Sequence, residues 1–159
     1  MRGFDDFAIG DRVRMGPVRV SHLEALEFAR RYDPQPFLLS DAGAEGSPIF
    51  ERMAVSGWLV SALMNRLIVE DMLANPVKLV GMPGVERLHW TRPVYPGDEL
   101  MLEAEVVAAR RLASRPTIGL VRQQIRTRNQ DRKVVLTAML ALMVAAPERL
   151  VVMHRMVDA

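Results

Sequence analysis

The chain of 159 residues contains no cysteine, which excludes disulfide bonds, thiolate nucleophiles and cysteine-ligated zinc. Histidine is scarce as well: His22, His89 and His154 lie far apart, without the spacing typical of metal ligands. Aromatic residues make up only 6%, the net charge is +2 and no basic run occurs, a composition that does not favour nucleic-acid binding. We therefore expect no metal, no cofactor and no nucleic-acid partner.

Long hydrophobic runs are also missing. No stretch of about 18 apolar residues is free of charge, and the chain begins MRGFDDFAIGD, with acidic residues where a signal peptide needs an apolar segment. We therefore expect a cytoplasmic protein without a membrane partner. What remains is an ordinary globular composition, 50% hydrophobic and 25% charged, at a length that fits one domain.

The first half of the chain predicts one strand and two long helices. Residues 11–20 alternate between apolar and polar side chains, as a strand does, and a capping box precedes a helix over residues 21–31. The prolines of the DPQP word at 33–36 predict extended chain, followed by a short turn over 41–46. Residues 56–73 are apolar on most sides, which indicates a buried central helix.

The second half predicts four strands separated by turn-forming residues. They cover residues 85–94, 99–109, 117–129 and 134–145. With the first strand they indicate an α+β fold in which an antiparallel five-stranded sheet wraps around the long central helix. The last strand is apolar on both faces, and only one face can pack on that helix. We expect a second subunit to cover the other face.

Three separated words carry a family resemblance. They are DPQP after Tyr32, SGW at residues 56–58 and RPVYPGD at residues 92–98. In this order they resemble the MaoC-like dehydratases and (R)-specific enoyl-CoA hydratases of the hotdog fold. The resemblance implies one hotdog domain over residues 5–147, with 148–159 as an appended tail. It also implies an acyl-CoA or acyl-carrier-protein thioester as ligand, and as partner either further copies of the chain, in a homodimer or higher multiple, or a second hotdog subunit.

The same resemblance implies which residues act. Asp33 matches the family's catalytic carboxylate at the mouth of an apolar acyl tunnel, whereas an Asp before proline taken alone indicates only a helix end. The family's catalytic histidine lies five residues later, and here that residue is Leu38, which has neither donor nor acceptor. Gly57 matches the glycine whose N–H polarises the thioester carbonyl, and it opens the central helix, where N–H groups are free.

Further residues are candidates for substrate binding. Gln35 lies in the DPQP word, Leu38 and Trp58 border the expected acyl pocket, and Ser56 is expected to cap the central helix. Asn65 matches a polar position near the family's site, and a buried structural network explains it equally well. The apolar side chains of the central helix either line the pocket or belong to the core.

Two polar groups also have open interpretations. Arg110, Arg111 and Arg115 cluster near a strand end and either contact the phosphates of a CoA-like carrier or form a solvated rim. Ser40 and Asp41 stand where the family often has an Asp two residues after its histidine. We interpret both as helix caps.

These observations predict an acyl-thioester hydratase or dehydratase that uses Asp33 and Gly57. Its activity is expected to be weak because Leu38 replaces the histidine, and loss of a general acid or base lowers rates by about 10² to 10⁴. The alternative is a non-catalytic acyl-CoA-binding or assembly subunit of a hotdog pair. A third possibility is a thioesterase in which a lone carboxylate activates water. Leu38 favours the non-catalytic subunit, and the intact DPQP and SGW words favour the hydratase.

Overall fold

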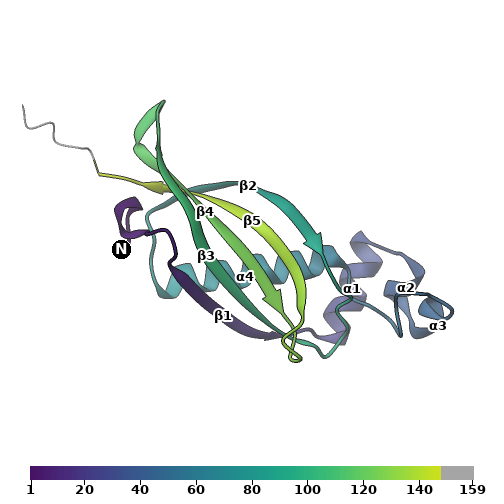
Figure 1. The fold of residues 1–159 in the computed structure, drawn as a ribbon. Helices are drawn as coiled ribbons and strands as arrows, with labels where there is room; N and C mark the ends of the chain where they lie inside the picture. Colours follow the sequence, from purple (N-terminus) through teal and green to yellow (C-terminus); the bar gives the residue numbers. More distant parts are fainter. Residues whose placement is uncertain (148–159) are drawn as a thin grey trace, which may run out of the picture.

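The structure is a computed structural model that describes residues 1–147. Five antiparallel strands form one sheet in the order β1-β3-β4-β5-β2, which curves around the long helix α4, Gly57–Ala74 (Figure 1). The strands are β1 (Arg12–Arg19), β2 (Leu79–Trp90), β3 (Glu99–Leu112), β4 (Arg115–Arg128) and β5 (Val134–Ala145). This is the hotdog arrangement that the sequence predicts. The predicted tail, 148–159, lies outside the described residues.

Helix α4 packs into the core along one face, and not on most sides as the sequence predicts, because Trp58, Val69 and Leu73 are exposed. Its residues Leu63, Leu67 and Ile68 belong to one buried cluster with the inward-facing side chains of the sheet, such as Leu102 and Ile125. Along β4 every second residue from 121 to 127 is buried, as the alternation of its sequence predicts. Since a fully buried aliphatic side chain contributes ~1.5–3 kcal/mol, the helix and the sheet stabilise each other.

Three shorter helices gather at the N-terminal end of α4 (Figure 1). They are α1 (His22–Tyr32), α2 (Pro36–Leu39) and α3 (Asp41–Ala44), the last in place of the predicted turn. Ser21 caps α1 and Ser40 caps α3 by accepting backbone N–H groups of the first turn, so the prediction for Ser40 is confirmed. Asp41 is not a cap, because its carboxylate accepts the N–H of Met53 at 2.9 Å and ties α3 to the segment before α4.

Several predicted boundaries differ from the structure, and prolines explain two of the differences. The sequence predicts extended chain through Pro36, but Pro36 opens α2, at a position where a helix needs no N–H. It also predicts a strand over 85–94, whereas β2 begins earlier, at Leu79, and ends at Trp90. Pro93 cannot donate to a neighbouring strand, and the carbonyl of Val94 accepts the N–H of Val55. The chain after β2 therefore joins the segment that leads into α4.

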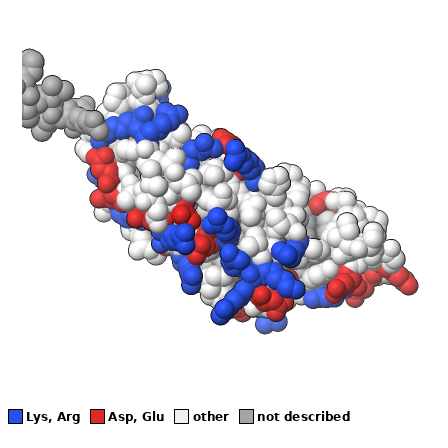
Figure 2. All heavy atoms as spheres, viewed as in Figure 1, with Lys and Arg blue, Asp and Glu red and all other residues white. Residues whose placement is uncertain are grey.

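The outer face of the sheet has two different parts. Over β1, β3 and β4 basic and acidic side chains pair, as Arg12 and Glu105 do at 3.1 Å, and Figure 2 shows charges of both signs interleaved over the strands. Over β5 the outward residues Met139, Ala141 and Met143 are uncharged and partly exposed. These three side chains keep part of their surface exposed within the part of the chain that the structure describes.

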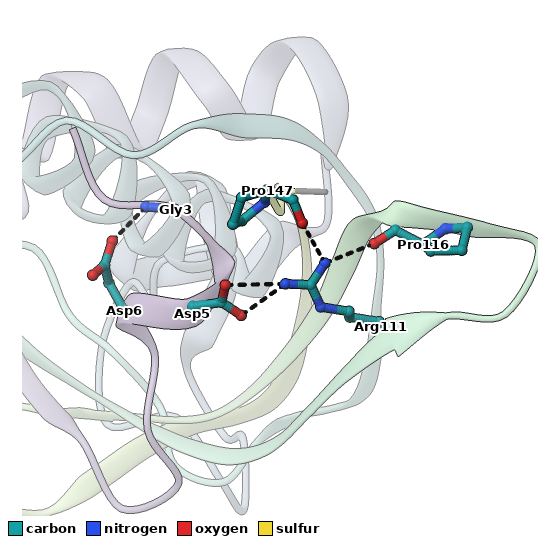
Figure 3. Close-up of polar contacts among 6 residues, drawn as sticks. All are labelled: Gly3, Asp5, Asp6, Arg111, Pro116 and Pro147. Carbon is teal, nitrogen blue, oxygen red and sulfur yellow. Dashed lines mark hydrogen bonds and ion pairs between the residues drawn. The ribbon is translucent and has the colours of Figure 1, made fainter. Parts of the chain in front are cut away.

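A single arginine joins three segments at the end of the sheet remote from α1–α3 (Figure 3). Arg111 on β3 donates to both carboxylate oxygens of Asp5, at 3.1 and 3.0 Å. It also donates to the carbonyls of Pro116, at 3.0 Å, and Pro147, at 2.7 Å. The short 3₁₀ helix η1, Phe4–Asp6, is thereby fixed to the β3–β4 hairpin, and Phe4 fills the space beside Gly119 on β4.

Candidate active site

Asp33 ends α1 and presents its carboxylate toward the start of α4. Its backbone N–H bonds to the carbonyl of Ala29 at 2.9 Å, which closes the last helical turn. Carboxylate oxygen Oδ2 accepts the hydroxyl of Ser56 at 2.7 Å, and Oδ1 accepts the side-chain amide of Gln35 at 2.7 Å. The carboxylate is partly buried and is held in one orientation by these two donors.

Ser56 connects this carboxylate to the central helix. It is only 1% exposed, and its hydroxyl accepts the N–H of Trp58 at 3.2 Å, so the predicted helix cap is confirmed. The N–H of Gly57, the first in α4, has no acceptor within residues 1–147. Because the start of a helix carries a partial positive charge, this N–H can donate to an oxygen atom of a ligand.

An indole ring covers the start of α4. Trp90, the last residue of β2, packs against Gly57 so closely that a β-carbon at position 57 would overlap the ring. Its Nε1–H donates to the hydroxyl of Ser61 at 3.1 Å, and that hydroxyl donates to the carbonyl of Gly57 at 2.9 Å. Trp58 meets this ring edge-on, with centroids 4.9 Å apart. Sequence reasoning missed Trp90, although it lies two residues before the RPVYPGD word.

These groups border a cavity of about 410 Å³. Its polar side chains include Asp33 and Gln35, and most of its wall is apolar. The apolar part includes Phe37, Ile49, Phe50, Val55, Val60 and Val135. Pockets for small molecules commonly enclose ~300–1,000 Å³, mostly within apolar walls that carry a few polar groups. The cavity therefore has the size and lining of a small-ligand site, with one carboxylate at its edge.

The structure brings most of the predicted site residues to this cavity. Those that border it are Asp33, Gln35, Leu38, Gly57 and Trp58. Ser56 lies behind the carboxylate of Asp33, where it orients that group. Asn65 does not reach the cavity, because it is an exposed residue of α4 about two turns beyond Gly57.

Leu38 is packed as a core residue at the position where the sequence resemblance implies a histidine. It is 3% exposed and forms a small buried cluster with Ala29 and Ala54, and Phe37 and Phe50 pack around them. Its side chain also forms part of the cavity wall. The site therefore has an apolar surface at the place where the family's motif implies a second polar group for water.

Two further groups of candidate residues have structural roles. Arg111 is held by Asp5 and by two carbonyls, so it belongs to a structural network, unlike its exposed neighbours Arg110 and Arg115. The buried apolar residues of α4 such as Leu63 belong mainly to the core.

Within residues 1–147 no cluster of three His, Cys, Asp or Glu side chains suits a metal ion. No helix of this part is long and apolar enough to span a membrane.

Comparison with known proteins identifies relatives of the whole domain. A crystal structure of a MaoC-like dehydratase from Rhodospirillum rubrum superposes with a TM-score of 0.83 at 35% identity, covering 94% of this chain and 100% of that one. The (R)-hydratase PhaJ1 of Pseudomonas aeruginosa shares the fold, with a TM-score of 0.66 and 23% identity over 91% of this chain and 86% of that one. The uncharacterized protein YdeM of Bacillus subtilis is 25% identical over 140 residues, 88% of this chain and 96% of that protein.

The family model described as "MaoC like domain" matches residues 6–129, a span that contains every predicted site residue. This match covers most of the chain and includes all three words on which the sequence resemblance rests. The chain therefore belongs to the MaoC-like dehydratase family.

Proposed function

We propose that the cavity binds an acyl thioester of CoA or acyl carrier protein, and that the protein acts on it as a hydratase or dehydratase. The observation that carries this proposal is the meeting of the Asp33 carboxylate and the Gly57 N–H at one apolar cavity. Hydration of an enoyl thioester requires a base for water and a donor for the carbonyl oxygen. Membership of the MaoC-like family, and the relative of 35% identity that is called a dehydratase, support the same reaction.

In the hydration direction water adds its hydroxyl to the β-carbon and a proton to the α-carbon. Asp33 takes a proton from the water as the new C–O bond forms, and the electron pair of the C=C bond moves toward the carbonyl oxygen. The N–H of Gly57 donates to that oxygen while it carries the developing charge. Protonated Asp33 then returns the proton to the α-carbon, and dehydration is the reverse sequence. Leu38 offers the water no hydrogen bond, so we expect slow turnover.

Intrinsic fluorescence tests the binding step directly, because the chain has only two tryptophans and both border the cavity. Titration with butanoyl-CoA should change the emission and saturate, and titration with free CoA, which lacks the acyl group, should give a much weaker response. Loss of crotonyl-CoA absorbance with time then measures turnover. If butanoyl-CoA changes neither the emission nor the heat in calorimetry, the proposal is wrong.

A second candidate, a non-catalytic thioester-binding subunit, is favoured by one observation. Leu38 is built into an apolar cluster, so the position of the histidine serves packing here. This candidate predicts the same binding of butanoyl-CoA with no measurable hydration of crotonyl-CoA. The thioesterase alternative would have Asp33 activate water for attack on the thioester carbonyl carbon, and no observation at this cavity favours that attack over addition to the β-carbon.

We also propose that a second copy, or a second hotdog chain, covers the uncharged outer face of β5. Met139, Ala141 and Met143 lie there partly exposed, beside a part of the sheet whose charges are paired. Light scattering at micromolar concentration should give a dimer or a multiple of dimers. A monodisperse monomer would contradict this assembly but leave the binding proposal intact.

A further inference from the structure

We propose that Trp90 determines the size of the acyl group that the site accepts, and that it does so as a unit with Gly57. This inference rests on the proposed function and names a substrate class within it, thioesters with short acyl groups. Trp90 borders the same cavity as Asp33, and its ring lies on the first residue of α4. The indole therefore forms the wall beside the N–H group that is expected to meet the thioester carbonyl.

The indole is fixed at both its ring and its backbone. Its Nε1–H donates to Ser61 at 3.1 Å, and Trp58 contacts it edge-on. The next residue, Thr91, bonds through its N–H to the carbonyl of Val135 at 2.9 Å and through its hydroxyl to the carbonyl of Val134 at 2.7 Å. Trp90 is 45% exposed, and these contacts hold its ring in one orientation on the wall of the cavity.

This packing gives a reason for the glycine at position 57. The sequence resemblance assigns the missing side chain to the approach of a thioester carbonyl. In the structure the space that a β-carbon would occupy is filled by the ring of Trp90. An added methyl group would push the ring away from α4, which would change the shape of the cavity. Gly57 and Trp90 should therefore respond to substitution together.

The place of the indole limits the room for an acyl group. The ring lies on the first residue of α4 and borders the cavity of about 410 Å³, which must hold the thioester as well as the acyl chain. Removal of the indole joins the volume of the ring to the cavity. Each methylene buried there contributes about 0.8 kcal/mol, roughly a fourfold gain in affinity. A chain longer by a few methylenes should gain most from the change.

The experiment compares calorimetric affinities for butanoyl-CoA and octanoyl-CoA. Wild type should bind butanoyl-CoA at least as tightly as octanoyl-CoA, and Trp90→Ala should shift the ratio at least tenfold toward octanoyl-CoA. Val85→Ala, on the same strand but away from the cavity, should leave the ratio unchanged. Trp90→Phe, which keeps a smaller ring, should give a shift of the same sign and decides the question if the alanine variant does not fold.

A double-mutant cycle tests whether Gly57 and Trp90 act together. Gly57→Ala alone should weaken butanoyl-CoA binding at least tenfold, and the same change in the Trp90→Ala background should weaken it less than threefold. If wild type binds both thioesters but neither Trp90 variant alters their ratio, the inference about Trp90 is wrong while the proposed function stands. If wild type binds neither thioester, both the proposed function and this inference are overturned.

Discussion

Two charged side chains at opposite ends of the domain are used in different ways. Arg111 makes four hydrogen bonds to a carboxylate and two backbone carbonyls, and its side chain is 15% exposed. Asp33 accepts two hydrogen bonds and borders a cavity. A carboxylate has about four lone-pair sites, so Asp33 can accept further hydrogen bonds from a ligand. Arg111 can only donate, and it uses most of its N–H groups on fixed partners. Spare bonding capacity that faces a cavity distinguishes a group available to a ligand from one that stabilises the fold.

The two side chains, Arg111 and Asp33, also lie beside different parts of the hydrophobic interior. Arg111 lies beside the main core, where its cation is near the ring of Phe4, 5.7 Å from the centroid. Asp33 is supported by the small cluster around Ala29, Leu38 and Ala54, which is separate from the main core. The site end of the molecule can therefore change chemically at little cost to the sheet and α4.

The largest effect is expected from Leu38→His, which places a second polar group beside Asp33. A correctly placed general acid or base contributes about 10² to 10⁴ in rate, so hydration of crotonyl-CoA should rise at least tenfold. An imidazole within the small cluster should also lower the free energy of unfolding by about 1–3 kcal/mol. The assay is the loss of enoyl-thioester absorbance with time.

Leu39→His is the matched control, because Leu39 packs on the same cluster but does not border the cavity. It should be destabilised to a similar degree without a gain in rate. A Leu38→His protein that folds and binds butanoyl-CoA yet remains inactive would favour the non-catalytic subunit.

The parts of the fold that periodicity determines could be predicted from the sequence. Residues 121–127 alternate because each face of β4 meets one environment. The apolar composition of α4 predicts burial on most sides, but only one face of the helix is buried, and Trp58, Val69 and Leu73 are exposed. Ser56 was identifiable as a cap because its partner is local, the N–H of Trp58. Asp33 could be found only through its motif, since its residue type alone equally indicates a turn.

The features that escaped prediction depend on neighbours distant in the sequence. Trp90 belongs to the site because β2 ends against the start of α4, which no local pattern reveals. Asp41 resembles a cap but bonds to Met53, twelve residues away. The end of β2 is set by the pairing of Val94 with Val55, a contact that competes with the strand propensity of the segment.

Arg111→Met should produce the largest loss of stability at the end of the domain remote from the site. Asp5 and the two proline carbonyls lose a charged donor, and hydrogen bonds to charged groups contribute about 1.5–3 kcal/mol. We expect the free energy of unfolding, measured with urea, to fall by about 2–3 kcal/mol. Exposed Arg110→Met should change it far less, and the affinity of either folded variant for butanoyl-CoA should equal that of wild type. Weaker butanoyl-CoA binding by Arg111→Met would contradict the view that Arg111 stabilises the fold without affecting the cavity at the other end of the domain.

Ser56→Ala should affect both properties, because Ser56 caps α4 and also donates to Asp33. Loss of a helix cap costs about 0.5–2 kcal/mol, and Asp33 loses one of its two donors. Ser40→Ala removes a cap with no contact to Asp33, so it should show a similar loss in urea without weaker thioester binding. Equal binding by the two variants would indicate that Ser56 serves the helix alone.

The smallest change in stability is expected from Asp33→Asn, and Asp98→Asn provides the contrast. Both carboxylates accept two hydrogen bonds, Asp98 from Tyr95 N–H and the Gln130 amide. The side-chain oxygen of Gln130 also accepts the N–H of Glu99. The amide of Gln130 therefore cannot rotate by half a turn to suit an asparagine at position 98 without losing that bond. Asp98→Asn should therefore cost about 1–3 kcal/mol.

At Asp33 the donor amide belongs to Gln35, which is exposed and can turn so that its oxygen meets the new amide. The new side chain keeps one oxygen for the hydroxyl of Ser56. We expect Asp33→Asn to change the free energy of unfolding by less than about 1 kcal/mol, and to abolish the hydration gained in the Leu38→His background, because an amide cannot take the proton of water. A loss of stability as large as that of Asp98→Asn would place Asp33 with Arg111 among the groups that hold the fold, and would remove the basis for treating its spare lone pairs as the centre of the site.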